Sequence, residues 1–128
     1  GVIRWLLKDE KPELRSNGDL IREWVYVEDV VNAYKQMGIS ILKKRNNHLS
    51  YNFSSGEHFS VIDIYNKISI AIKGKIIKPS YVDNSNEEIK DQILNSDLIK
   101  DELGIESIYK FDNAIIKTID WYKKYFKG

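Results

Sequence analysis

The 128-residue sequence contains no cysteine. Disulfides, thiolate metal sites and cysteine nucleophiles are therefore excluded, and the composition fits a reducing compartment, so we expect a cytoplasmic protein. No apolar run approaches the roughly 20 residues that span a bilayer, so no membrane partner is expected. Lys and Arg number 20 against 19 Asp and Glu, with the signs mixed along the chain. Nucleic acid requires a basic surface, so it is not an expected partner either.

Glycine is also sparse, and the seven glycines are widely spaced. No two of them lie close enough to build a dinucleotide-binding fingerprint or a phosphate-binding P-loop. The two histidines, His48 and His58, fall in predicted loops at strand ends, where a plain surface role is expected. Neither has a serine and an acid that the sequence can assign to a catalytic triad. The sequence therefore predicts no catalytic residue on this chain.

What the sequence does have is the composition of an ordinary globular domain, with 42% apolar and 30% charged residues. Its length is that of one domain, which we place at residues 1–128. Runs of β-branched and aromatic residues alternate with apolar residues at helical spacing, which predicts an α/β or α+β domain. Strands are expected at 13–15, 23–27, 49–53 and 76–82, helices at 2–10, 28–45, after Ser60, before Gly104 and from Asp112, and a loop at 84–91.

Several helix ends carry capping signals. Ser60 is followed by Asp63 at the third helical position, where the acid of a capping box would sit. Ser96 and Asp112 are expected to cap two further helices, and Gly104 suits the left-handed position after a helix. Gly38 is different, because a glycine inside a helix costs on the order of 1 kcal/mol relative to alanine. We therefore expect a packing reason for Gly38.

One stretch carries a family pattern. The run of residues 12–31, PELRSNGDLIREWVYVEDVV, resembles a segment of the extended short-chain dehydrogenases/reductases, the NAD-dependent epimerase/dehydratase family. That segment combines a strand, a glycine turn, an Arg-acidic-aromatic triplet and Tyr-Val-x-Asp-Val, and in the family it follows the Rossmann half and lines the sugar-nucleotide pocket. Residues 51–56, 88–104 and 111–125 resemble the family's late strand, closing region and terminal helix.

The resemblance implies the C-terminal substrate-binding part of an extended Rossmann-type enzyme, with mixed short strands and helices and the Rossmann half missing. Because the chain begins in the middle of an amphipathic pattern, we expect that an upstream NAD-binding domain has been cut away. The family's glycine-rich turn and Tyr-x-x-x-Lys pair lie in that upstream part, and none of the eight tyrosines here has a lysine at that spacing. The resemblance thus implies NAD in the intact enzyme, no cofactor on this chain, and an inactive isolated chain.

Within the family, the runs 14–18 and 88–92 are most similar to those of CDP-glucose 4,6-dehydratases. In the reaction that this resemblance implies, NAD accepts a hydride from C4 of the sugar, water leaves across C5 and C6, and the hydride returns to C6. Two alternatives stay open. One is a fragment of an NAD-dependent nucleotide-sugar epimerase, and the other is a non-catalytic module for nucleotide-sugar binding or oligomerisation.

By resemblance, four residues are expected to contact a nucleotide-diphosphate sugar: Arg22, Leu14, Arg15 and Gln92. Arg22 is placed at the diphosphate, because arginine supplies a rigid fork of donors that suits phosphate and lysine does not. The alternative for Arg22 is an ion pair with Glu23 or Glu28.

The other three candidates also have plainer alternatives. Leu14 and Arg15 are expected to flank a pyrimidine base, although Leu14 also fits the core of a strand. Gln92 is expected to hydrogen-bond the nucleotide or the sugar, but a polar loop residue fits nearly as well. Asn17 is an adjacent candidate whose side chain can equally stabilise the turn at 16–19.

A final expectation concerns assembly. In the family, the strand that matches residues 51–54 joins the edge of the Rossmann sheet, and its neighbour is missing from this chain. An unpaired strand edge invites pairing with another chain. We therefore expect self-association through the strand at 51–54, or disorder around it.

Overall fold

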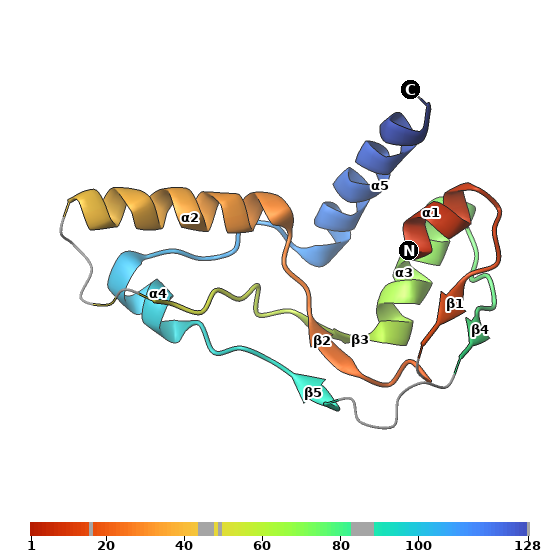
Figure 1. Cartoon of the computed structure of the whole chain (residues 1–128), viewed down its shortest axis with the longest axis horizontal. Coiled ribbons are helices and arrows are strands. Elements are labelled where there is room, and N and C mark those ends of the chain that lie inside the picture. The colour runs from red at the N-terminus through yellow and green to blue at the C-terminus, as the bar shows by residue number, and fades with distance from the viewer. Residues whose placement is uncertain (16, 44–47, 49, 83–88, 128) are drawn as a thin grey trace. The chain divides into compact units, whose positions relative to one another are not determined.

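Short strands alternate with helices along the chain (Figure 1), as the expected α/β class requires. The computed structural model describes residues 1–15, 17–43, 48, 50–82 and 89–127. The elements in chain order are α1 (Val2–Leu7), β1 (Glu13–Leu14), β2 (Ile21–Glu23), α2 (Val27–Leu42), β3 (His58–Ser60), α3 (Val61–Lys73), β4 (Ser80–Tyr81), β5 (Asp91–Gln92), α4 (Asp97–Leu103) and α5 (Phe111–Lys127). Within the described residues, no helix combines the length and the apolar character needed to cross a membrane.

The chain divides into two compact units. The first unit comprises Gly1–Arg22, Phe59–Gln92 and Asp112–Gly128, and the second comprises Glu23–His58 and Ile93–Phe111. The strands form two small sheets, one of order β1-β4 and one of order β3-β2-β5. Both β1 with β4 and β2 with β5 pair in parallel.

The first unit is built around helix α3. Its apolar stripe buries Ile64 and Ile68, together with Tyr65. The helix begins at the predicted cap: the Ser60 hydroxyl accepts a hydrogen bond from the Asp63 backbone N–H at 3.1 Å and donates one to the Asp63 carboxylate at 2.6 Å. It ends at Gly74, which adopts the left-handed conformation.

The second unit has a core in which Ala33 of α2 meets Ile99 of α4 and Ile105. Helix α4 stops at Gly104, which has a φ of +66°, as predicted. Its start differs from the expectation. Ser96 occupies the cap position, but its side chain makes no capping bond. Instead the Asn95 side-chain oxygen accepts from the Asp97 backbone N–H at 2.9 Å.

The predicted strand at 49–53 is wrong. Residue 49 lies outside the described residues, and residues 50–57 form no strand; the next strand is β3 at His58–Ser60. The reason is packing: Tyr51 and Phe53 lie against the Ala33 cluster, and a strand requires a hydrogen-bonded neighbour in addition to suitable side chains. Residues 51–54 pair with no strand among the described residues, and the expected self-association through them remains a prediction.

The other predicted strands are shorter or shifted. The segment expected at 23–27 forms β2 at Ile21–Glu23, and helix α2 already begins at Val27. The segments expected at 13–15 and 76–82 form only Glu13–Leu14 and Ser80–Tyr81. Each of these two strands can only be as long as its partner, because they pair with one another.

Two further boundaries needed correction. Of the expected loop at 84–91, residues 84–88 lie outside the described residues, and Asp91 begins strand β5. Asp112 lies in the first turn of α5 rather than before it, and its carboxylate pairs with the Lys67 ammonium group at 2.7 Å. Such an acid still opposes the partial positive charge at the start of the helix.

Candidate functional site

Two of the four predicted ligand residues are neighbours on adjacent strands. Arg22 of β2 and Gln92 of β5 are register partners in a parallel pair, and Ile21 pairs with Asp91 beside them. Side chains of register partners project from the same face of a sheet. The structure therefore brings together a guanidinium and a primary amide that are separated by 70 positions in the sequence.

The Arg22 guanidinium is anchored to the backbone of this strand pair. Its Nη1 donates to the Ile21 carbonyl oxygen at 2.8 Å and to the Lys90 carbonyl oxygen at 3.3 Å, and the residue is half-buried. The Ile21 backbone N–H also donates to the Lys90 carbonyl at 2.9 Å. These bonds fix one end of the planar fork, which is the kind of preorganisation that phosphate recognition uses.

Leu14 lies in the other sheet, and Arg15 follows it in the chain. Leu14 in β1 is 5% exposed and pairs with Tyr81 of β4. Its side chain is therefore a core residue, as the plainer interpretation of the sequence held. Arg15 follows β1 directly and is exposed. The contacts of all four residues with a nucleotide-diphosphate sugar remain predictions.

The turn between β1 and β2 is stabilised by hydrogen bonds of its own residues. The Asn17 side chain accepts from the Asp19 backbone N–H at 3.2 Å and donates to the Asp19 carboxylate at 2.7 Å. Gly18 has a φ of +93°, and its carbonyl oxygen accepts from the Ile62 N–H at the start of α3. Asn17 thus stabilises the turn.

Two acids of the family-like segment have structural roles that the sequence did not reveal. Each oxygen of the Glu23 carboxylate accepts a backbone N–H, from Ser55 at 2.9 Å and from Leu94 at 3.0 Å. Glu28, by contrast, is exposed, and its carboxylate accepts from the Tyr26 hydroxyl at 3.1 Å. The only signal for Glu23 was its place in the Arg-acidic-aromatic triplet, which names a residue type and not a partner.

Asp29 is the second such acid, and it is buried in the second unit. Its carboxylate accepts three hydrogen bonds: from the Ser107 hydroxyl at 2.6 Å, the Ile108 N–H at 3.0 Å and the Tyr109 N–H at 3.1 Å. A buried charge needs such partners. Asp29 also lies in the first turn of α2, where a negative charge is favourable, but its partners lie 78–80 positions away.

A carboxylate, a phenol and an imidazole meet elsewhere in the second unit. Glu102 of α4 accepts from the Tyr51 hydroxyl at 2.6 Å, and its other oxygen lies 2.6 Å from His48 Nδ1. Burial, and secondarily the bond to Glu102, raises the pKa of Tyr51 above its usual value. Tyr51 therefore keeps its proton and acts as a donor. The residue four positions later is Ser55, so Tyr51 has no lysine at the spacing that a catalytic tyrosine of this family requires.

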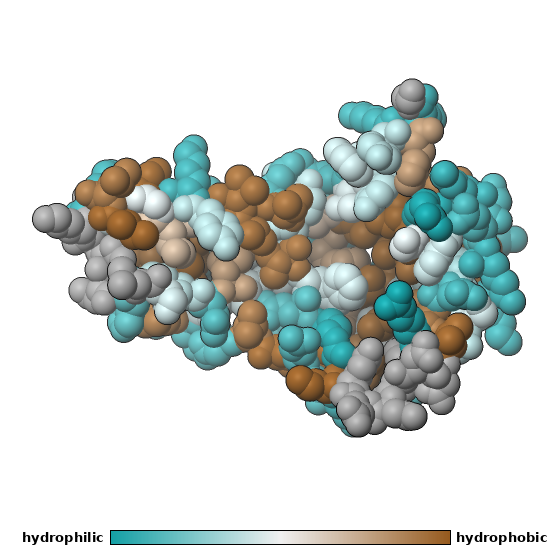
Figure 2. Space-filling model, viewed as in Figure 1, coloured by the Kyte–Doolittle hydropathy of each residue, from teal (hydrophilic) through white to brown (hydrophobic). Residues whose placement is uncertain are grey.

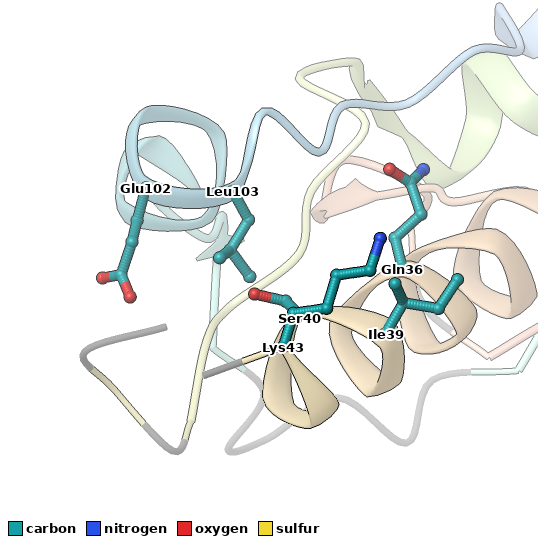
Figure 3. A pocket seen from close by; sticks show the side chains of 6 residues that line it. All are labelled: Gln36, Ile39, Ser40, Lys43, Glu102 and Leu103. Atoms are coloured by element: carbon teal, nitrogen blue, oxygen red, sulfur yellow. The ribbon is translucent and has the colours of Figure 1, made fainter. Parts of the chain in front are cut away.

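A cavity of about 330 Å³ lies in the second unit between α2 and α4 (Figure 3). Its lining residues are Gln36, Ile39, Ser40, Lys43, Glu102 and Leu103. The Ser40 hydroxyl is buried there and has no hydrogen-bond partner among the described residues. None of the four predicted ligand residues lines this cavity.

The chain offers little to a cofactor or a metal ion. Its seven glycines stand at positions 1, 18, 38, 56, 74, 104 and 128, so no glycine-rich dinucleotide-binding turn can form within it. Among the residues that the structure describes, no group of three or more histidine and acidic side chains is arranged to hold a metal. The chain therefore lacks the glycine-rich turn by which such folds hold a dinucleotide.

Comparison with known proteins connects the chain to sugar-nucleotide enzymes. No protein-family model matches it. In sequence it is 25% identical to a dTDP-glucose 4,6-dehydratase of Xanthomonas campestris, in an alignment of 130 residues that covers 94% of this chain and 36% of that protein. The chain therefore spans about a third of the length of the curated relatives that it matches.

Solved structures share its fold. A UDP-glucose 4-epimerase from Thermotoga maritima, in complex with UDP-glucose, superimposes with a TM-score of 0.85 at 20% identity, over 98% of this chain and 38% of that one. A dTDP-glucose 4,6-dehydratase from Bacillus anthracis, in complex with NAD, gives a TM-score of 0.80 at 24% identity, over 96% and 37%. The chain therefore has the fold of a part of the extended epimerase/dehydratase enzymes, and its sequence is related to that of dTDP-glucose 4,6-dehydratases.

Proposed function

We propose that this chain is the C-terminal, nucleotide-sugar-binding part of an NAD-dependent sugar-nucleotide 4,6-dehydratase. The observation that carries the proposal is the pairing of Arg22 with Gln92 on adjacent strands. The similarity to dTDP-glucose 4,6-dehydratases over 94% of the chain supports the same reaction class. The domain so defined covers residues 1–128 and works in the cytoplasm with an NAD-binding part outside them.

The chemistry of the pair suits this ligand. A nucleotide-diphosphate sugar carries two negative charges, and the anchored Arg22 guanidinium provides fixed donors for them. A primary amide such as that of Gln92 both donates and accepts hydrogen bonds, as sugar hydroxyls and base edges require. Leu14 and Arg15 flank the pyrimidine in this proposal, with the exposed Arg15 as the direct contact.

Two nucleotide bases are candidates for the substrate. The curated relatives act on dTDP-glucose according to their names. The runs at 14–18 and 88–92 favour CDP-glucose, although residues 16 and 88 lie outside the described residues. CDP-glucose and dTDP-glucose both carry a pyrimidine base, so we propose a pyrimidine-nucleoside-diphosphate glucose as the substrate. Measured affinities for the two compounds decide between cytosine and thymine.

In this proposal the oxidant is NAD, and it binds to the part of the enzyme outside residues 1–128. NAD is bound in the related structure from Bacillus anthracis, whereas the glycine spacing of this chain does not suit a dinucleotide. We therefore propose that the intact enzyme uses NAD and that residues 1–128 alone convert no sugar. A 4-keto-6-deoxy product formed by the purified chain with NAD and CDP-glucose or dTDP-glucose would contradict this.

An epimerase is the second candidate. The UDP-glucose 4-epimerase from Thermotoga maritima superimposes with a TM-score of 0.85, against 0.80 for the dehydratase from Bacillus anthracis. The two reactions use the same kind of substrate, so the binding residues proposed above serve either one. Product analysis distinguishes them, because only the dehydratase yields a 4-keto-6-deoxy sugar.

Calorimetric titration of the chain tests the binding proposal. CDP-glucose, dTDP-glucose and UDP-glucose are each titrated into the wild type, Arg22→Ala and Lys90→Ala. Lys90 is the matched control, because its exposed side chain is removed while its carbonyl, which holds Arg22, remains. We expect Arg22→Ala to weaken binding at least about tenfold, since a charge-assisted hydrogen bond contributes about 1.5–3 kcal/mol. Equal affinity in both variants, or no affinity in the wild type, contradicts the proposal.

A further inference from the structure

The cavity between α2 and α4 contains a buried hydroxyl group that the fold leaves unsatisfied. Ser40 is 9% exposed, and its hydroxyl has no hydrogen-bond partner among the described residues. A serine inside a helix can donate to the carbonyl oxygen four residues earlier, here that of Gln36, but Ser40 does not. Figure 3 shows this hydroxyl pointing from α2 toward Leu103 of α4. Because a buried polar group needs a partner, a molecule that enters the cavity can supply what the fold does not.

A cation and an amide face the same cavity. Positions 36, 40 and 43 are separated by four and three residues, so Gln36, Ser40 and Lys43 follow one side of the helix. The Lys43 side chain is exposed, and its ammonium group forms no ion pair with a described residue. In Figure 3 it points toward the Gln36 amide, which supplies further N–H donors. The cavity therefore presents a positive charge and several hydrogen-bond donors.

The acid that lines the cavity is already engaged. One oxygen of the Glu102 carboxylate accepts from the Tyr51 hydroxyl and the other lies 2.6 Å from His48 Nδ1. Figure 3 shows this carboxylate pointing away from Ser40 and Lys43. The charge of Glu102 is therefore opposed by His48 and Tyr51, and it does not neutralise Lys43.

We propose that this cavity binds a small monocarboxylate with a short aliphatic chain. A carboxylate is an acceptor-only group, so it suits the donors of Ser40, Lys43 and Gln36. One cation balances one negative charge, which favours a monocarboxylate over a phosphate monoester. The remaining lining residues Ile39 and Leu103 provide apolar surface for the chain.

The size and surroundings of the cavity fit such a ligand. Its volume of about 330 Å³ lies at the lower end of the range for small-molecule sites, roughly 300–1,000 Å³. Figure 2 shows hydrophobic side chains next to hydrophilic ones over α2, as a ligand with both characters requires. All six lining residues belong to the second unit, so the proposal does not depend on the sugar-nucleotide site.

Isocaproate is the probe, and its alcohol, isohexanol, is a neutral control of similar shape. Each is titrated into the isotope-labelled chain, and saturable NMR shifts of the Ser40 and Leu103 amides give the dissociation constants. For a ligand of this size we expect a constant on the order of 1 mM for isocaproate. Isohexanol should bind at least about tenfold more weakly, because it lacks the charge-assisted hydrogen bonds.

Two lysines on α2 test the role of charge. Lys43→Met removes the ammonium group but keeps an unbranched chain, and it should weaken isocaproate binding at least about tenfold. Lys35→Met is the matched control, because Lys35 is exposed on the same helix and does not line the cavity. Its affinity for isocaproate should equal that of the wild type. Arg22→Ala should also leave this affinity unchanged, so this proposal and the proposed function can fail separately.

A second pair of variants tests the buried hydroxyl. Ser40→Ala should weaken isocaproate binding about fivefold, because one hydrogen bond to the carboxylate is lost. The substitution also raises helix propensity, and Gly38→Ala controls for that effect. The packing reason expected for Gly38 is not found among the described residues, since none comes within 4 Å of a Cβ added there. Gly38→Ala should therefore bind isocaproate as the wild type does.

Three outcomes would overturn the proposal. Without saturable shifts at Ser40 and Leu103 in the wild type, the cavity holds only solvent. Equal affinities for isocaproate and isohexanol would make it an apolar hole without preference for an anion. Unchanged isocaproate affinity in Lys43→Met would place the probe elsewhere. This last substitution alters an exposed side chain, so it decides the matter even if Ser40→Ala fails to fold.

Discussion

The carboxylate of Asp29 accepts a hydrogen bond of 2.6 Å from the hydroxyl of Ser107, 78 positions further along the chain. The same carboxylate also accepts the backbone N–H groups of Ile108 and Tyr109. Because Asp29 is 1% exposed, water cannot take the place of its carboxylate as the acceptor for these donors. The start of α2 and the segment before α5 are thus joined through one buried acid.

Replacement of Asp29 should destabilise the chain strongly. Asp29→Ala leaves buried donors unsatisfied, and we expect the free energy of unfolding to fall by about 2–3 kcal/mol. Glu28→Ala is the control, since this neighbouring acid is exposed and surface changes usually stay within about 0.5 kcal/mol. Urea denaturation followed by tryptophan fluorescence measures both. Similar midpoints for the two variants would show that the Asp29 bonds contribute little.

Gly18 and Gly56 allow the steric cost of an added Cβ to be separated from its conformational cost. Gly18 and Gly56 both have positive φ, +93° and +71°. A Cβ at Gly18 would lie 2.8 Å from the Ile62 Cβ, whereas no described residue comes within 4 Å of one at Gly56. We expect Gly56→Ala to cost about 1–2 kcal/mol from backbone strain alone, and Gly18→Ala to cost more. The difference in unfolding free energy measures the contact with Ile62, and equal costs would mean that α3 shifts without penalty.

Tyr65 should make stability fall at alkaline pH. Its hydroxyl donates to the Ile77 carbonyl at 2.6 Å, and burial raises its pKa. An unfolded tyrosine ionises near pH 10, while the folded one keeps its proton. The contribution of Tyr65 is therefore fully present below about pH 10 and is lost as pH rises through the folded pKa.

The variant Tyr65→Phe checks this dependence. It should lower stability by about 1 kcal/mol at neutral pH, through loss of the hydrogen bond, and flatten the alkaline decline. Tyr34→Phe serves as the control, because its ring is exposed. Unfolding free energies from urea titrations between pH 8 and pH 11 provide the measurement. An unchanged alkaline slope in Tyr65→Phe would assign the decline to another group.

The bond between Tyr51 and Glu102 predicts a change in titration. Burial and the Glu102 carboxylate both raise the pKa of Tyr51. Glu102→Gln should therefore lower this pKa toward the usual value without reaching it, since burial remains. NMR titration of tyrosines labelled at the ζ carbon measures it, with Tyr51→Phe used for assignment. Glu106→Gln, which removes an exposed acid paired with Lys100, should leave the Tyr51 titration unchanged.

Local features of the fold could be predicted from the sequence, whereas the strands could not be placed accurately. The cap at Ser60 and the stop at Gly104 depend on residues within one helical turn, so their sequence signals suffice. Strands β1 and β5 are two residues long and exist because distant segments pair with them. Their pairing partners, not their own residues, determine where they begin and end.

The candidate site, like the fold, could be predicted from the sequence only in part. The family-like segment identified Arg22, and the closing region identified Gln92, but only the structure shows that the two strands are in register. The predicted strand at 49–53 failed because Tyr51 and Phe53 have strand-forming side chains but pack against the core without a neighbouring strand. The roles of Glu23 and Asp29 required knowledge of backbone groups far along the chain, which no local pattern contains.

The Glu23 carboxylate has a consequence for the order of folding. Its two oxygens join the Ser55 and Leu94 amides, which lie 32 and 71 positions away. Contacts that close such long loops form late, because the entropy of closure must be overcome before the bond contributes. Both amides should consequently gain protection from solvent deuterium in the same slow step, after the caps of α3 and α4 have formed.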